Sequence, residues 1–306
     1  MAKVHLDTDF GGDIDDLAAL AMLLKLPDVE ITGITTVADE NGRRAGYVHH
    51  VLQLAGREGI PVAAGADTGS GRYRWHPTYP PEDAFWPEPV VPAPGPLDAA
   101  LSLLKRSIDS GAIVIGIGPY TNVALLDERH PGILARAQIV LVGGWVQPPR
   151  PTRSTWGNAM DYNVQMDVSA AEHVMRNSQP TLVPLHVTVE TTLRHADLPV
   201  LDAGDAVSRL MARQARAFDA AGELEAIDRA ASTDLPADFI NHLYDPLGCA
   251  VALGWSGAVV EELPLSLSIE DGWLHERVAE GGTPMKVATR VDGPAFDECW
   301  RDLVSH

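Results

Sequence analysis

The stretch LDTDFGGDIDD, residues 6–16, holds five aspartates within ten positions: Asp7, Asp9, Asp13, Asp15 and Asp16. Neighbouring carboxylates raise one another's pKa and destabilise a fold unless a positive charge lies among them. Capping of the following helix explains one or two aspartates at most. Hard cations such as Ca²⁺ take oxygen ligands, and carboxylates from a strand end and the next helix start can converge on one ion. The sequence therefore predicts a cation site.

The elements around this stretch are those of an α/β fold. Residues 3–7 predict a strand, residues 17–26 predict a helix, and the Gly11-Gly12 pair permits a tight turn between them. The alternation continues with strands at 30–37, 60–65, 112–118, 138–144 and 181–185, and with helices at 46–56, 97–108, 120–128 and 169–176. Nearly continuous apolar strands indicate a mostly parallel central sheet with helices on both faces. Ligands of such sheets bind beyond the carboxyl ends of the strands.

Composition narrows the class of protein. The chain has 306 residues, of which 45% are hydrophobic, so one large domain over residues 1–306 is expected. With 23 Lys and Arg against 42 Asp and Glu, the net charge of -19 disfavours nucleic acid and anionic membranes as partners. Two cysteines, Cys249 and Cys299, form no disulfide framework, and no apolar run approaches about 18 residues. A cytoplasmic protein is expected.

Two stretches interrupt the alternation of strands and helices. Residues 67–96 contain eight prolines, and residues 145–160 have a similar composition. Loops of this length are usually functional lids or disordered. Disordered segments are poor in aromatic residues, so the tryptophans of the two loops favour lids: Trp75, Trp86, Trp145 and Trp156.

Several further motifs follow the acidic stretch in a recognisable order. The sequence resembles the inosine-uridine nucleoside hydrolase family, with a lengthened acidic loop, from about residue 4 to residue 270. The resembling segments are LDTDFGGDIDD (6–16), ITGITTVADENG (31–42), GIGPYTNVALL (116–126), IVLVGGW (139–145), GNAMDYNVQMDVSAA (157–171) and YDPLGCAVAL (244–253). The resemblance implies a Rossmann-like core and hydrolysis of the N-glycosidic bond of a ribonucleoside or similar compound, giving free base and ribose.

The resemblance also implies a Ca²⁺ cofactor and roles for individual residues. Asp9 would contact the metal and take the proton of the attacking water. The other metal ligands would be Asp16, Asp245 and the backbone carbonyl of Ile117, while Asp15 would hold a ribose hydroxyl. Asp13 lies in the lengthened part of the loop and could exchange roles with Asp15. Family members are commonly dimers or tetramers, so a homo-oligomer acting on a small-molecule nucleoside is expected.

Other substrate contacts are implied by the same resemblance. Asn158, Asp161 and Asn163 would bind sugar hydroxyls, although each could instead satisfy the local backbone of a turn. Trp145 and Trp156 could stack on the nucleobase or pack the lid. Asp245-Pro246 is also an ordinary helix start, so capping is the alternative to metal ligation there.

The chain departs from the family pattern around the substrate. Many members carry His directly before the C-terminal Asp-Pro, whereas this chain has Tyr244, with His242 two residues earlier. Tyr244 could donate a proton or stack on the base, and His242 could act as the acid or be a packed histidine. Glu40 stands where the family usually has Asn, and Asp161-Tyr162 replaces Glu-Phe. Retained metal chemistry with an altered substrate is therefore expected.

Two other functions fit part of the sequence. Haloacid dehalogenase-like phosphatases begin with a similar Asp-x-Asp strand end, which would make Asp7 a nucleophile and Asp9 an acid. That alternative leaves Asp15, Asp16 and the Asp-Pro motif unexplained. The other alternative is a metal-containing ligand-binding protein that has lost catalysis. Burial of several carboxylates without a use is costly, which disfavours it.

Overall fold

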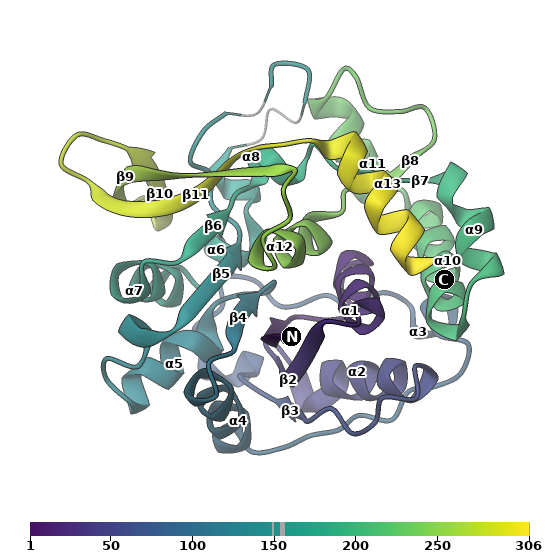
Figure 1. Ribbon diagram of the computed structural model, residues 1–306, viewed down its shortest axis with the longest axis horizontal. Coiled ribbons are helices and arrows are strands. Elements are labelled where there is room, and N and C mark those ends of the chain that lie inside the picture. The colour runs from purple at the N-terminus through teal and green to yellow at the C-terminus, as the bar shows by residue number, and fades with distance from the viewer. Residues whose placement is uncertain (149, 154–156, 306) are drawn as a thin grey trace.

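The computed structural model describes residues 1–148, 150–153 and 157–305, and within these residues one sheet runs through the molecule (Figure 1). Its nine strands lie in the order β10-β9-β11-β6-β5-β4-β1-β2-β3. Their bounds are β1 (Ala2–Thr8), β2 (Val29–Thr36), β3 (Val62–Ala64), β4 (Ile113–Gly116), β5 (Gln138–Val142), β6 (Thr181–Val183), β9 (Ala258–Glu270), β10 (Trp273–Val278) and β11 (Thr283–Val291). A separate antiparallel pair joins β7 (Leu193–Arg194) and β8 (Phe239–Asn241).

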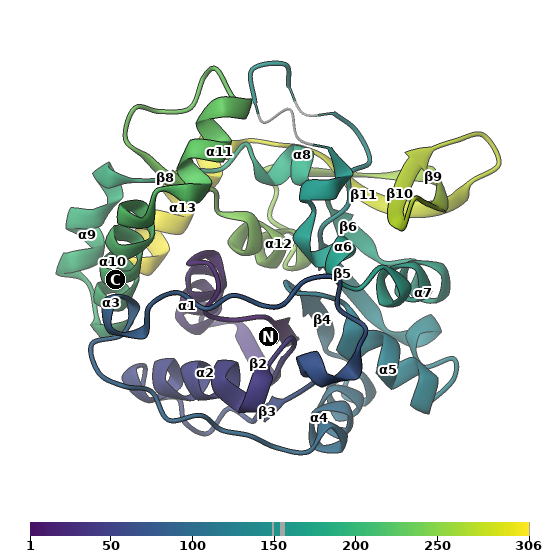
Figure 2. The ribbon, with the colours of Figure 1, turned by 180° about the vertical axis from the view of Figure 1, so that it is seen from behind.

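Seven neighbouring strands of the large sheet, from β3 to β11, pair in parallel, which confirms the expected fold class. The strands and helices expected before residue 186 all form, with ends that differ by a few residues. The sequence analysis did not identify β9, β10 and β11. β9 pairs antiparallel with both β10 and β11. The three strands project from the body of the molecule as an arm, seen from both sides in Figures 1 and 2.

Helices connect and cover these strands. They are α1 (Asp15–Lys25), α2 (Arg43–Leu54), α3 (Glu82–Phe85), α4 (Leu97–Asp109), α5 (Thr121–Arg129), α6 (Tyr162–Met166), α7 (Val168–Ser178), α8 (Leu185–Thr188), α9 (Leu198–Ala203), α10 (Ala206–Ala221), α11 (Glu223–Ala231), α12 (Tyr244–Ala252) and α13 (Gly293–Val304). Single-turn 3₁₀ helices cover Glu40–Gly42, Thr68–Ser70, Leu134–Arg136, Asn158–Met160 and His195–Asp197.

Alternating side chains of the central strands build a core on each face of the sheet. In β5, Val140 and Val142 join a core that includes side chains of α1, α2 and α12. Ile139 and Leu141 of the same strand join a second core with side chains of α4, α5 and α7. Both faces of β5 are thus buried by helices, as expected for a parallel sheet.

The parallel register gathers the strand ends at one edge. Asp7 of β1 is paired with Thr35 of β2 and with Gly116 of β4, so the loops that follow these strands start side by side. Helix α1 begins from the loop after β1, and α12, which comes from the far end of the chain, packs against it (Figure 1). Polar residues distant in sequence therefore meet at the carboxyl edge of the sheet.

The loop 67–96 is packed against the body of the molecule. Trp86 is 2% exposed, and its ring stacks on Tyr47 of α2 with the centroids 4.5 Å apart. In the described part of the loop 145–160, Arg150 makes a bidentate ion pair with Glu190, with bonds of 2.7 and 2.6 Å. Both cysteines are free. No helix in the described ranges has the length and apolar character required to cross a bilayer.

Asn122, at the start of α5, joins three strand ends under the carboxyl edge. Its side-chain amide donates to the Asp7 carboxylate and to the Thr36 carbonyl, at 2.8 Å in both cases. Its oxygen accepts from the backbone N–H of Ala66 at 2.9 Å. All three bonds are buried, so one side chain satisfies groups from the ends of β1 and β2 and from the segment after β3.

We expect Asn122→Ala to lower the free energy of unfolding by about 2–4 kcal/mol, because it leaves buried polar partners without a hydrogen bond. Urea unfolding of both proteins measures the difference. The matched control is Asn177→Ala, which removes an exposed bond to the His173 carbonyl and costs less than about 0.5 kcal/mol. Equal effects of the two substitutions would contradict the structural role of Asn122.

Candidate active site

A cavity of about 340 Å³ lies at the carboxyl edge of the sheet. The ends of β1, β4 and β5 and the first turns of α1 and α12 contribute to its wall. Six acidic side chains line it: Asp9, Asp13, Asp15, Asp16, Asp161 and Asp245. The acidic stretch found in the sequence therefore faces a space large enough for a small organic molecule.

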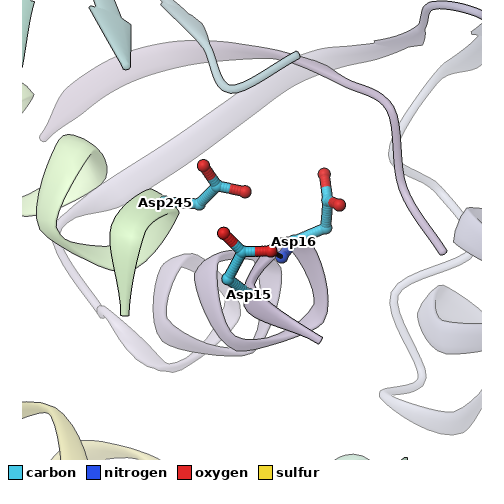
Figure 3. Close-up of side chains that lie close together, drawn as sticks. All are labelled: Asp15, Asp16 and Asp245. Carbon is cyan, nitrogen blue, oxygen red and sulfur yellow. Dashed lines mark hydrogen bonds between the residues drawn. The ribbon is translucent and has the colours of Figure 1, made fainter. Parts of the chain in front are cut away.

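Three of these carboxylates converge on one point. Asp15 and Asp16 lie in the first turn of α1, and Asp245 lies in the first turn of α12. One oxygen from each lies within 4.8 Å of the others, and Figure 3 shows the Asp15 and Asp245 carboxyl groups facing each other. The N-terminal ends of two helices thus point their partial positive charges toward this cluster.

The charges of this cluster are poorly balanced by protein groups. Burial raises the pKa of Asp15, Asp16 and Asp245 well above the ordinary value, and repulsion from the neighbouring aspartates raises each further. The Thr8 hydroxyl donates to the Asp16 carboxylate and offsets part of this effect. A site of this kind favours a cation.

The donor set fits a hard divalent cation. All the converging atoms are carboxylate oxygens, which Ca²⁺ and Mg²⁺ prefer. Ligands about 2.3–2.6 Å from one Ca²⁺ lie up to about 5 Å from one another, which is compatible with the 4.8 Å spread of the three carboxylates. Asp15, which the resemblance placed on a ribose hydroxyl, is here a member of the same cluster as Asp16 and Asp245.

Asp9 lies directly after β1 and is flanked by a buried arginine. The Arg44 guanidinium donates through Nη1 to the backbone carbonyls of Asp9 and Phe10, and through Nε to the Ala38 carbonyl at 2.9 Å. Burial raises the pKa of the Asp9 carboxyl, and the positive charge of Arg44 opposes that rise. The positively charged side chain of Arg44 is therefore held directly beside the Asp9 backbone.

Asp13 is directed toward another part of the cavity wall. Its carboxylate accepts from the Asn241 side-chain amide at 2.6 Å, which ties the lengthened acidic loop to β8. Burial raises the pKa of Asp13 to about 7. Asp13 lines the cavity but lies outside the group of three converging carboxylates.

On the wall formed by β4 and β5, Asn163 bonds to two strand ends. Its Nδ2 donates to the Ile117 carbonyl at 3.2 Å and to the Val142 carbonyl at 3.0 Å. Ile117, whose carbonyl was suggested as a metal ligand, therefore lines the cavity beside Asn163, which was suggested for sugar binding. Asp161 also lines the cavity, but its carboxylate already accepts from the N–H groups of Gly144 and Val164 and caps α6.

Tyr244 and His242 occupy different environments. Tyr244 lines the cavity, and burial and surrounding carboxylates raise the pKa of its phenol well above the ordinary value. This shift favours the protonated form of the phenol. His242 is fully buried, with Nδ1 2.7 Å from the Thr191 carbonyl, and it is not among the residues that line the cavity.

The structure does not bring three other candidates to the cavity. Glu40 is exposed on the 3₁₀ turn before α2. Asn158 donates to the Leu274 carbonyl of β10 at 3.0 Å, so its amide is engaged by the arm. Trp145 faces a second hollow, and its backbone N–H donates to Glu276 at 3.2 Å. Trp156 lies outside the described residues.

Three polar side chains of the described cavity wall were not among the sequence candidates: Arg44, Thr78 and Tyr162. Thr78 belongs to the loop 67–96, so one residue of this loop lines the cavity. Tyr162 follows the loop 145–160, and its ring stacks on Trp75 with the centroids 6.1 Å apart. No sequence signal separates Arg44 from Arg43, because only the rotational phase of α2 decides which of the two faces the sheet.

Comparisons with known proteins agree with this geometry. A family model described as inosine-uridine preferring nucleoside hydrolase matches residues 4–298. The pyrimidine-specific ribonucleoside hydrolase RihA of Klebsiella pneumoniae subsp. pneumoniae is 30% identical over 210 residues, which are 64% of each chain. The match thus spans slightly less than two thirds of that relative. RihA of Salmonella paratyphi B is 29% identical over 228 residues, 68% of each chain.

Solved structures share the fold over the full length. A plant nucleoside hydrolase superposes with a TM-score of 0.77 at 20% identity, covering 99% of each chain. A purine-preferring ribonucleoside hydrolase from Gardnerella vaginalis gives a TM-score of 0.76 at 21% identity, covering 99% of this chain and 98% of that one. Since the family model matches nearly the whole chain, this protein belongs to the inosine-uridine preferring nucleoside hydrolase family.

Proposed function

We propose that the protein catalyses the metal-dependent hydrolysis of the N-glycosidic bond of a ribonucleoside or nucleoside-like compound, releasing free base and ribose. The observation that carries this proposal is the convergence of Asp15, Asp16 and Asp245 in the cavity of a chain that matches the family model. Cleavage of this bond develops oxocarbenium character on the sugar, and carboxylates around the sugar stabilise that positive charge.

We assign the cofactor as Ca²⁺, held by Asp9, Asp16, Asp245 and the Ile117 carbonyl. When bound, such a cation lowers the pKa of a coordinated water and fixes its position. Asp15 and Asn163 are then placed to hold ribose hydroxyls, since both line the cavity beside these ligands. Asp13, which bonds to Asn241, holds the acidic loop in place.

Asp9 is the proposed general base. Its carboxylate takes the proton of the attacking water, while Arg44 favours its ionised form. The acidic lining also bears on the substrate, because six carboxylates repel a phosphate group. An uncharged nucleoside is therefore favoured over a nucleotide.

The two alternative functions are less compatible with the site. The Asp7 carboxylate, which a phosphatase would use as nucleophile, is 1% exposed and accepts bonds from Thr35 at 2.5 Å and Asn122 at 2.8 Å. It is absent from the cavity wall. A protein that only binds a ligand would retain the cluster but would release no base, so measured hydrolysis distinguishes it from the enzyme.

We expect Asp9→Asn to lower kcat for base release by about 10²–10⁴-fold, because the variant has no carboxylate to accept the proton of water. The measurement is chromatographic detection of free base from a panel of purine, pyrimidine and modified nucleosides with Ca²⁺ present. Treatment with a chelator should abolish the activity of the unaltered protein.

The matched control is Asp127→Asn, which neutralises a buried carboxylate of α5 outside the cavity. It should retain turnover within about threefold of the unaltered protein. Full activity of Asp9→Asn, or activity that survives chelation, would refute the proposed mechanism. Absence of base release from every nucleoside, with Ca²⁺ still bound, would favour the ligand-binding alternative.

We expect Asp245→Asn to have opposite effects with and without metal. In chelator at pH 7.5 it should stabilise the fold by about 1–3 kcal/mol, since it removes one of the mutually repelling buried charges. The unaltered protein should gain about 2.7 kcal/mol at a Ca²⁺ concentration 100-fold above Kd, and the variant should lose most of this gain.

Thermal unfolding with Ca²⁺ and with chelator measures both effects, and Asp127→Asn again serves as the control, with its Ca²⁺ response intact. An Asp245→Asn variant that is destabilised in chelator and still responds fully to Ca²⁺ would show that Asp245 only caps α12.

A further inference from the structure

The departing nucleobase needs stabilisation that the groups described so far do not supply. As the glycosidic bond breaks, its electron pair moves to the base, so a hydrogen-bond donor or positive charge at the base lowers the barrier. His242 does not line the cavity, and Tyr244 stands beside the cluster residue Asp245 in the first turn of α12. The site therefore requires another group on the base.

Arg44 has the required chemistry and location. Among the described residues that line the cavity, it is the one Lys, Arg or His side chain. It is 1% exposed, and three backbone carbonyls, those of Ala38, Asp9 and Phe10, hold its Nε and Nη1. A guanidinium stays protonated across the physiological range, so this charge is permanent and its orientation is fixed.

One nitrogen of Arg44 is available to a ligand. Nη2 carries two N–H groups, and within the described residues neither donates to an acceptor. The three carbonyl bonds occupy Nε and Nη1, so the backbone groups that hold the side chain do not use this donor pair. The same carbonyl bonds prevent the side chain from swinging away.

The neighbours of Arg44 place it on the wall formed by the two loops. Gly12, in the acidic loop, has the Arg44 Nη1 and the Thr78 carbonyl as the nearest groups to the position of a Cβ, at 3.6 and 3.9 Å. The charge of Arg44 interacts most strongly with Asp9, and also with Tyr79, Tyr162 and Asp16. The three converging carboxylates come from α1 and α12. A ribose held among these carboxylates has Arg44, Thr78 and Tyr162 on the same cavity wall as possible contacts for its base.

We propose that Arg44 binds and stabilises the leaving nucleobase by donating from Nη2 to an oxygen or nitrogen acceptor of the base. This inference rests on the proposed function. The C1′–N bond breaks with its electron pair going to the base, the water oxygen bonds to C1′, and the water proton goes to Asp9. The base anion, stabilised by Arg44, then takes a proton from solvent. Nucleobases with an accessible carbonyl oxygen or ring nitrogen are the substrate class.

The test compares leaving groups of different quality. Inosine and uridine release bases that need stabilisation, whereas p-nitrophenyl β-D-ribofuranoside releases a phenolate that leaves readily without help. We expect Arg44→Met to lower kcat on the nucleoside that the unaltered protein cleaves by about 10²–10³-fold. On the p-nitrophenyl riboside the loss should stay below about tenfold, and Arg44→Lys should lie between.

Arg43→Met is the matched control. Arg43 neighbours Arg44 on α2 and lies 4.4 Å from the Tyr79 ring centroid, but it does not line the cavity. Its ratio of nucleoside to p-nitrophenyl riboside turnover should equal that of the unaltered protein. The Ca²⁺-induced rise in Tm reports whether the metal site is intact in each variant, and Arg44→Lys decides the question where Arg44→Met does not fold.

Equal losses on both kinds of substrate would overturn the role of Arg44 at the base and leave it as a residue that only positions Asp9. Cleavage of the p-nitrophenyl riboside alone by the unaltered protein would also overturn it, while leaving ribosyl hydrolysis standing. Cleavage of neither kind of substrate, with the broader nucleoside panel also inactive, would refute the proposed function itself.

Discussion

Repulsion among buried carboxylates is the constraint on which the site depends. Asp15, Asp16 and Asp245 lie too close together and too far from water to be stable as three free charges. Helix N-termini and the Thr8 hydroxyl offset part of that cost, but hydrogen bonds and dipoles do not equal the two charges of a divalent ion. A divalent cation is thus the counter-charge that this cluster favours, and it is also the proposed cofactor of the reaction.

The parallel sheet is what makes such a concentration of charge possible. Parallel strands deliver all their following loops to one edge, and the register of β1 with β2 and β4 aligns those loops closely. Because α1 packs against α12, a carboxylate from the end of the chain is added to those from its beginning. The Asn122 side chain then joins these strand ends through three buried hydrogen bonds. The scaffold under the cavity thus consists of hydrogen-bonded strand ends, while loops contribute to its outer wall.

Sequence signals predicted the parts of the molecule that are governed by local regularity. Apolar strands alternating with helices are repeated often enough to identify the sheet, and five aspartates in one turn have few uses besides binding a cation.

Glu40, Asn158 and Trp145 were placed at the substrate by resemblance, but loops have no periodicity that fixes where a side chain points. The strands β9 to β11 were missed because the arm projects from the body and is exposed on much of its surface, so its residues lack a continuous apolar pattern. Arg44 was missed because Arg43 and Arg44 are adjacent and chemically identical. Only the rotation of α2 about its axis decides which of the two lines the cavity.

Among the described residues, the cavity wall combines a carboxylate cluster with one arginine side chain. In the proposed reaction the sugar gains positive character as the base gains negative character, so the two halves of one substrate need opposite environments. The carboxylates of α1 and α12 would surround the sugar, and Arg44, which lies beside Asp9, would contact the base. Interchanging these charges would oppose the separation of charge in the transition state. Since fixed charges need little reorganisation as the bond breaks, their placement can lower the barrier.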